Sequence, residues 1–289
     1  MIYNRLLDFR PREQLEGLTD DGRVALLVDV LSAGPSEAAW EAICELFALW
    51  PDSQAKLRSL EQADRDLAAW DDRLRTADTS SRALFEGARL ASLARIVKSV
   101  SVYRREDGGD RELEAIVRSE DAAHLTRLTI VRSDIGQRVW QLFIDSPFLA
   151  SLRHFHVTNA VMGGDVVRQI LRSGRLPHLE CLKLIKVGLD AEAVRVTEPA
   201  GFALRQVDFS MNVLREAGAQ ALAQARWLQS VERLTLRDNF IPGPGMRALL
   251  SSPYLTSLKQ IDLSGNAVTG VERADLTRIA TERQIELTI

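Results

Sequence analysis

One short apolar pattern recurs along the last two thirds of this 289-residue chain and constrains the fold more than any other feature. The pattern reads apolar-x-x-apolar-x-apolar-x-x-(Asn or small)-x-apolar, and its clearest copies begin at Leu204, Val231 and Leu258. With weaker copies included, it begins at residues 97, 125, 152, 179, 204, 231 and 258, a period of 25–28 residues. A fixed period of this length predicts structural units that stack on one another and bury a continuous core.

Each copy predicts a short strand followed by a helix. Apolar residues two positions apart, such as Leu234 and Leu236, lie on one face of a strand and point into the core. The Asn that follows can bond backbone groups where the chain leaves the strand. Apolar residues then recur at helical spacing, as an amphipathic helix packed on a sheet requires. These helical stretches are 137–145, 165–173, 215–226 and 245–252.

The residue sequence of the repeats resembles the leucine-rich repeat family, in particular the bacterial type of the ribonuclease-inhibitor-like class. Arg215-EAGAQALAQ and Ser257-LKQIDLSGNAV carry this resemblance, which covers residues 92–289. It implies a right-handed α/β solenoid, a horseshoe of about seven repeats that binds partners on its concave strand face. Three earlier repeats depart from the pattern, with Ser133, Ala160 and Val187 at the Asn position. Those turns must be stabilised in another way.

Residues 1–91 carry no such repeat and predict an all-α region. Helices are expected over 22–32, 36–50, 53–76 and 80–95, the second with Ser36 as its N-cap. The region has a net charge of −6, against +3 for the rest of the chain. It is expected to cap the open end of the solenoid or to serve as an acidic docking region. At the other end, residues 284–289 either add a terminal strand or simply cap the stack.

Composition argues against several function classes. The formal net charge of −3 gives no reason to expect nucleic acid or an anionic membrane as partner. No apolar run approaches the ~18 residues of a membrane helix, and the amino terminus lacks the apolar core of a signal peptide. Two cysteines, Cys44 and Cys181, make no disulfide framework. These features together predict a cytoplasmic protein.

Catalytic chemistry has weak support in the sequence. No nucleotide-binding glycine motif, nucleophile elbow or metalloprotease motif is present, so we expect no enzyme and no cofactor. His124 and His178 precede strands and are expected to be solvated. His154 and His156 share the outer face of one strand, with Cys181 beside His154 on the next. These three could hold zinc, but no fourth ligand is evident, and a polar surface is the favoured interpretation.

The outward positions of the strands define the candidate binding face. It is mildly basic and flanked by Arg132, Arg153, Lys186, Arg205 and Lys259, which favours a protein partner with an acidic patch. The expected function is therefore a non-enzymatic protein–protein interaction module. The alternative is a regulator of an enzyme, either a nuclease or protease inhibitor or a GTPase-activating protein. The candidate partner-binding residues are Arg127, His154, His156, Lys183, Asp208, Arg233 and Arg237.

Overall fold

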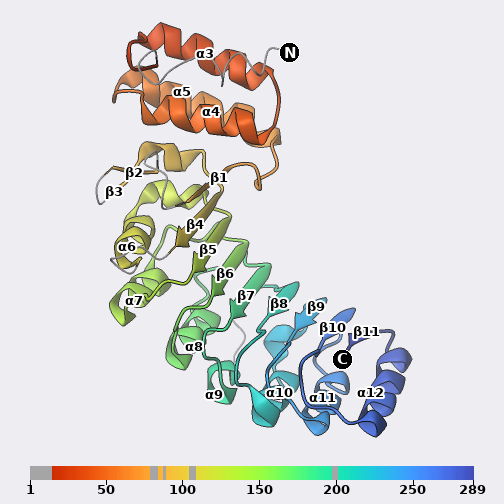
Figure 1. The fold of residues 1–289 in the computed structure, drawn as a ribbon. Coiled ribbons are helices and arrows are strands. Elements are labelled where there is room, and N and C mark those ends of the chain that lie inside the picture. The colour runs from red at the N-terminus through yellow and green to blue at the C-terminus, as the bar shows by residue number, and fades with distance from the viewer. Residues whose placement is uncertain (1–14, 79–83, 87–88, 104–108, 197–200) are drawn as a thin grey trace.

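A computed structural model describes residues 15–78, 84–86, 89–103, 109–196 and 201–289. Its main feature is a nine-stranded, all-parallel sheet in which the strands follow one another in chain order (Figure 1). The strands are β1 (Thr76–Asp78), β4 (Ser99–Tyr103), β5 (Arg127–Val131), β6 (His154–Thr158), β7 (Cys181–Ile185), β8 (Gln206–Asp208), β9 (Arg233–Thr235), β10 (Gln260–Asp262) and β11 (Glu286–Thr288). Strands β4 to β10 occupy the seven predicted copies of the pattern.

Helices follow the strands and lie along the outer side of a curved row, while the strands line its inner side (Figure 1). This alternation is compatible with an α/β solenoid. The helices are α6 (Asp110–Arg118), α7 (Gln137–Asp145), α8 (Gly164–Arg172), α9 (Ala191–Val194), α10 (Arg215–Ala223), α11 (Gly243–Leu250) and α12 (Gly270–Glu282). Four of them, α7, α8, α10 and α11, confirm the predicted helical stretches to within a few residues.

The core lies between the sheet and these helices. In β5, Leu128 and Ile130 are fully buried, whereas the residues that alternate with them are half-buried on the other face. Phe155 in β6 continues this core and stacks on Phe143 of α7, with 4.7 Å between ring centroids. The two-residue period of the strands thus sends apolar side chains towards the helices and polar ones towards the inner side.

The chain leaves the six strands from β5 to β10 through a residue in the left-handed conformation. These residues are Arg132, Asn159, Lys186, Met211, Asp238 and Gly265, with φ between 51° and 72°. Each of these residues lies at the same position of its repeat, also in the three repeats in which the next residue is not Asn. A common backbone geometry therefore forms all six turns.

Asparagine bonds the backbone where the chain leaves the strands, as predicted, and Asn212 also reaches the departing turn at Val187 in the repeat before its own. Asn212 Oδ1 accepts hydrogen bonds from the backbone N–H groups of Val187, Gly188 and Leu189 at 3.0–3.1 Å. Its Nδ2 donates to the carbonyl of Leu184, one strand back, at 2.8 Å. In the first departing turn, Ser133 Oγ instead donates to the carbonyl of Val131 at 3.1 Å.

The described part of the amino-terminal section contains the helices α3 (Asp20–Ser32), α4 (Glu37–Ala48) and α5 (Gln54–Asp66). The first two confirm the predicted helices over 22–32 and 36–50, and the Ser36 hydroxyl accepts from the Ala39 N–H at 3.1 Å, so Ser36 is the N-cap. The helix predicted over 53–76 is wrong beyond Asp66. A short 3₁₀ turn over Leu67–Ala69 follows, and the chain then enters β1 because its backbone pairs with β4.

The helix predicted over 80–95 is also wrong where the structure describes it. A two-stranded antiparallel sheet, β2 (Phe85–Glu86) with β3 (Arg89–Leu90), precedes a 3₁₀ helix over Ser92–Arg95. Residues 80–83 and 87–88 of that prediction lie outside the described residues. The side chains of Leu84 and Leu93 are buried in this region. Their spacing in the sequence therefore reflects burial in two separate short segments and not one face of a helix.

At the carboxyl end, β11 pairs in parallel with β10, so residues 286–288 add a terminal strand. The preceding α12 starts with a capping box between Thr269 and Glu272. In the part of the chain that is described, no helix is long and apolar enough to cross a membrane.

Candidate functional site

Strand register arranges the inner-face side chains in rows that run across the sheet. Backbone pairing aligns the first outward position of each strand with that of the next. The first row reads Ser99, Arg127, His154, Cys181, Gln206, Arg233 and Gln260. The second reads Ser101, Thr129, His156, Lys183, Asp208, Thr235 and Asp262. Every predicted site residue except Arg237 therefore lies in one of two rows.

A hollow of about 520 Å³ lies over the first row and holds four of the predicted residues: Arg127, His154, Lys183 and Arg233. The rest of its lining comes from Arg73, Thr76, Ser99, Cys181 and Gln206. None of these described lining residues is acidic, whereas four carry a positive charge. We call this feature the basic hollow. His156, Asp208 and Arg237 are not part of its lining.

The cations of the basic hollow have few partners. Among the described residues, Arg73, Arg127 and Lys183 make no ion pair, and Arg233 Nη2 reaches only the Gln206 side-chain oxygen at 3.4 Å. Their positive charge is therefore available to a ligand.

Three of the five flanking cations, which the sequence interpretation counted towards a basic surface, are instead paired with glutamates. Arg153 pairs with Glu180 at 2.5 Å, and Glu232 pairs with Arg205 at 3.2 Å and with Lys259 at 2.8 Å. The two glutamates stand one repeat apart from their arginine partners, so only the stacking of repeats brings the charges together. Three of the five flanking cations are therefore neutralised, whereas Arg132 and Lys186 make no ion pair among the described residues.

Both inner-face histidines favour the neutral form. Burial, reinforced by the positive charge of Arg127, lowers the pKa of His154 below its ordinary value. Burial and the Lys183 ammonium likewise lower the pKa of His156, whose Nε2 lies 2.6 Å from the Thr158 hydroxyl. The two imidazoles therefore add polar surface to the inner face and no charge at neutral pH. His124 and His178 are exposed, as the sequence predicted.

The three residues weighed as metal ligands do not form a metal site. Register places Cys181 directly beside His154, as predicted, and His156 beside Lys183. Burial raises the pKa of the Cys181 thiol, which opposes the thiolate that a metal needs. Across the described ranges, no group of three or more His, Cys, Asp or Glu side chains could hold a metal ion.

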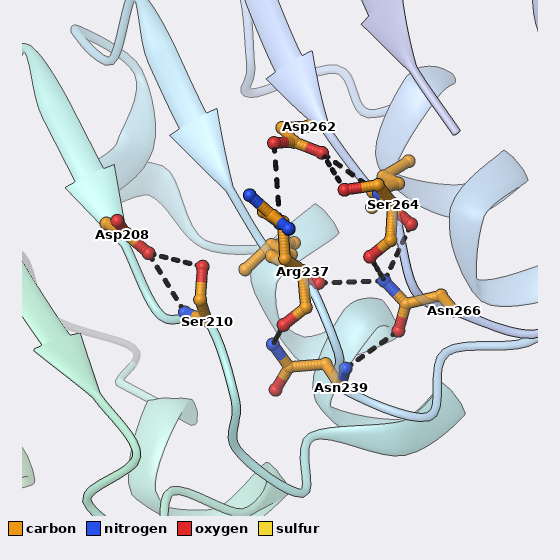
Figure 2. A network of polar contacts seen from close by, with 9 residues as sticks. Asp208, Ser210, Arg237, Asn239, Asp262, Ser264 and Asn266 are labelled. Atoms are coloured by element: carbon orange, nitrogen blue, oxygen red, sulfur yellow. Dashed lines mark hydrogen bonds and ion pairs between the residues drawn. The ribbon is translucent and has the colours of Figure 1, made fainter. Parts of the chain in front are cut away.

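Asp208 and Arg237 belong to a polar network towards the carboxyl end of the sheet (Figure 2). Asp208 Oδ1 accepts from the Ser210 N–H at 3.0 Å and from its hydroxyl at 2.6 Å. Asp262 and Ser264 repeat this arrangement, and Arg237 Nε lies 3.9 Å from Asp262 Oδ2. These carboxylates brace the strand ends, which leaves them less available to a partner than the cations of the hollow.

A second groove, which the sequence interpretation missed, adjoins the basic hollow. It measures about 580 Å³ and is acidic, because Glu37, Glu41 and Glu45 of α4 line it together with Asp78. Arg73 and Thr76 line both cavities, so the inner surface changes charge at β1. The four-residue spacing of the glutamates was visible in the sequence, but their position over the sheet depends on how α4 packs.

Comparison with known proteins gives little further information. The sequence matches no protein-family model and no curated protein. Among solved structures, it is similar to a structural-genomics protein from Bacteroides fragilis, with 15% sequence identity and a TM-score of 0.44. The similarity covers 68% of this chain and 66% of that one, slightly less than two thirds of its length.

Proposed function

We propose that this chain is a non-enzymatic protein-interaction module that binds an acidic region of another protein on its concave strand face. In this proposal it is a leucine-rich repeat protein of the ribonuclease-inhibitor-like class, with about seven repeats over residues 92–289. The period of the strands, the six left-handed turns and the Asn212 bonds all support that class. Parallel strands joined by crossover helices are almost always connected in the right-handed sense, which supports a right-handed solenoid.

The observation that carries the proposal is the basic hollow. Three cations from three strands, Arg127, Lys183 and Arg233, share it with Arg73 and no carboxylate among the described lining. Grouping like charges raises the electrostatic energy of the free protein, and a partner of opposite charge would lower that energy. Arginine is also among the residues that contribute most at protein interfaces.

The amino-terminal section, residues 1–91, fits the role of a cap in this proposal. An end repeat without a cap would expose its core to water. The Trp40 indole of α4 donates to the carbonyl of Thr76 in β1 at 2.6 Å, which ties the helices to the first strand. Two free cysteines, Cys44 and Cys181, agree with residence in the reducing cytoplasm.

The test is affinity capture from a lysate of the source cell, comparing the wild type with the triple variant Arg127→Ala, Lys183→Ala, Arg233→Ala. A matched control, Arg153→Ala, Arg205→Ala, Lys259→Ala, removes the same charge from ion-paired positions beside the strands. We expect the first variant to lose the partner and the second to keep it, with both folded by circular dichroism. Equal capture by all three proteins would contradict binding at the basic hollow.

The identity of the captured protein separates a plain interaction module from the alternative, a regulator of an enzyme. If the partner is a nuclease, a protease or a small GTPase, its activity is measured with and without the chain. A change in that activity would favour the regulator.

A further inference from the structure

The cations of the basic hollow surround one point on the sheet. Arg127 on β5 and Arg233 on β9 lie in the same row, each two strands away from Cys181 on β7. At the ~4.8 Å spacing of neighbouring strands, each arginine backbone is about 10 Å from that central position. Only His154 and Gln206 stand between the arginines and Cys181, and all five residues line the hollow.

The residue at the centre of this arrangement, Cys181, has a short side chain, and the positively charged Lys183 lies next to it. Cys181 is 7% exposed, so a short side chain forms the floor where longer ones form the walls. Lys183, two residues further along β7, brings an ammonium group to the same place from the second row. Arg73, which precedes β1, closes the side nearest the amino-terminal helices. A group above Cys181 would therefore face cations from several directions.

This geometry suits a compact anion better than an extended acidic surface. An acidic surface would be met best by cations spread along the face, but three of the five flanking cations, Arg153, Arg205 and Lys259, are already paired with glutamates. A phosphate monoester concentrates about two negative charges and three acceptor oxygens on a single centre. Guanidinium groups can each donate two parallel hydrogen bonds to such a group, and clusters of arginines are a recurrent means of binding it.

We propose that the basic hollow binds a phosphorylated serine or threonine side chain of the partner protein, held above Cys181 by Arg127, Arg233 and Lys183. The inference rests on the proposed function and specifies the chemistry recognised at the same face. A protein segment suits the site because the acidic groove adjoins the hollow at Arg73 and Thr76, which line both, so neighbouring residues of the partner chain have a second cavity on that side of the phosphate.

The probe is a fluorescein-labelled peptide library with a fixed central phosphoserine, compared with libraries carrying serine or glutamate at that place. Fluorescence polarisation should show at least about ten-fold tighter binding of the phosphoserine library than of either other library. Arg127→Ala with Arg233→Ala should remove the difference, whereas Arg153→Ala with Arg205→Ala should retain it.

Two more variants separate phosphate recognition from general attraction to acids. Arg127→Lys with Arg233→Lys keeps the charge but loses the paired donors, so it should weaken phosphopeptide binding several-fold. Cys181→Leu keeps every cation but fills the floor, and it should also weaken phosphopeptide binding, with its thermal unfolding measured to show that it remains folded. Binding unchanged in both variants would overturn the inference.

The remaining outcomes distinguish this inference from the proposed function. Equal affinity for the glutamate and phosphoserine libraries would overturn phosphate recognition and leave an acidic partner in place. Full competition by inorganic phosphate or free phosphoserine at the affinity of the peptide would point to a small-anion site instead. No binding of any library, together with capture of a partner that requires Arg127 and Arg233, would refute the phosphate and retain the interaction face.

Discussion

At the scale of single residues, the asparagines after the later strands each stabilise the unit before their own. Asn212 Nδ2 donates to Leu184, Asn239 Nδ2 to Phe209 and Asn266 Nδ2 to Leu236, all at 2.8 Å. Asn212 also accepts three backbone N–H groups from the preceding turn, whereas Asn239 Oδ1 is buried and has no hydrogen-bond partner among the described residues. The same residue type thus carries different numbers of bonds at equivalent positions.

We therefore expect Asn212→Ala to lower the free energy of unfolding by roughly 3 kcal/mol, because it leaves buried backbone donors unsatisfied. Asn239→Ala should cost less, on the order of 1–2 kcal/mol, since fewer bonds are lost. Urea denaturation followed by circular dichroism measures both variants. A larger loss for Asn239→Ala would show that the bonds of Asn212 do not set the stability of its turn.

At the scale of elements, a buried arginine joins the amino-terminal helices to the sheet, in addition to the Trp40 hydrogen bond to Thr76. Arg75, only 2% exposed, lies immediately before β1. Its guanidinium donates to the carbonyls of Ile96 at 2.8 Å and Leu67 at 3.2 Å, and pairs with Asp64 of α5 at 2.5 Å. One side chain thus links α5, the turn after it and the segment leading to β4.

Replacing Arg75 with Met should destabilise this joint by about 3 kcal/mol, because the bonds are lost while most of the volume is kept. Hydrogen exchange should then show faster exchange in α5 and β1 than in β8 to β10. The exposed Arg58→Met serves as a control and should leave exchange unchanged. Uniform acceleration throughout the sheet would contradict a local joint.

Comparison of elements also shows what the sequence can predict. The strands from β4 to β10 were predictable because each begins two residues after the start of a repeat whose apolar positions recur at a regular period. β1 was not, because Thr76–Asp78 lies outside the repeat and becomes a strand only by pairing with β4. The rows containing Arg127 and Lys183 followed from register. The pairing of Glu180 with Arg153, and the acidic groove, depend on packing between units that no local pattern records.

At the scale of the whole molecule, burial lowers the pKa of several histidines. It lowers the pKa of His154 and His156, and partial burial together with the charge of Lys98 lowers the pKa of His124, whose side chain is still 43% exposed. At Asp64, burial raises the carboxyl pKa, but the Arg75 hydrogen bond and the Lys98 charge outweigh it and lower the pKa overall. All four groups bind protons more readily in the unfolded chain than in the folded protein.

Stability should consequently fall on acidification. As the pH drops through 6.5, the ordinary value for histidine, the unfolded chain takes up protons that the folded protein does not, so the free energy of unfolding decreases. Asp64 adds to the loss at lower pH. Urea denaturation at several pH values should show a shallower decline for His154→Gln with His156→Gln than for the wild type.

The hydrogen bonds from these asparagines to the preceding repeat also affect folding during synthesis. A ribosome releases the chain from its amino end, so Leu184 and the turn after it emerge before Asn212 does. The same order holds for Leu236 and Asn266. Each of these turns is completed only when the following unit has been synthesised, and the folded part of a nascent chain should therefore trail the exit of the ribosome by one repeat.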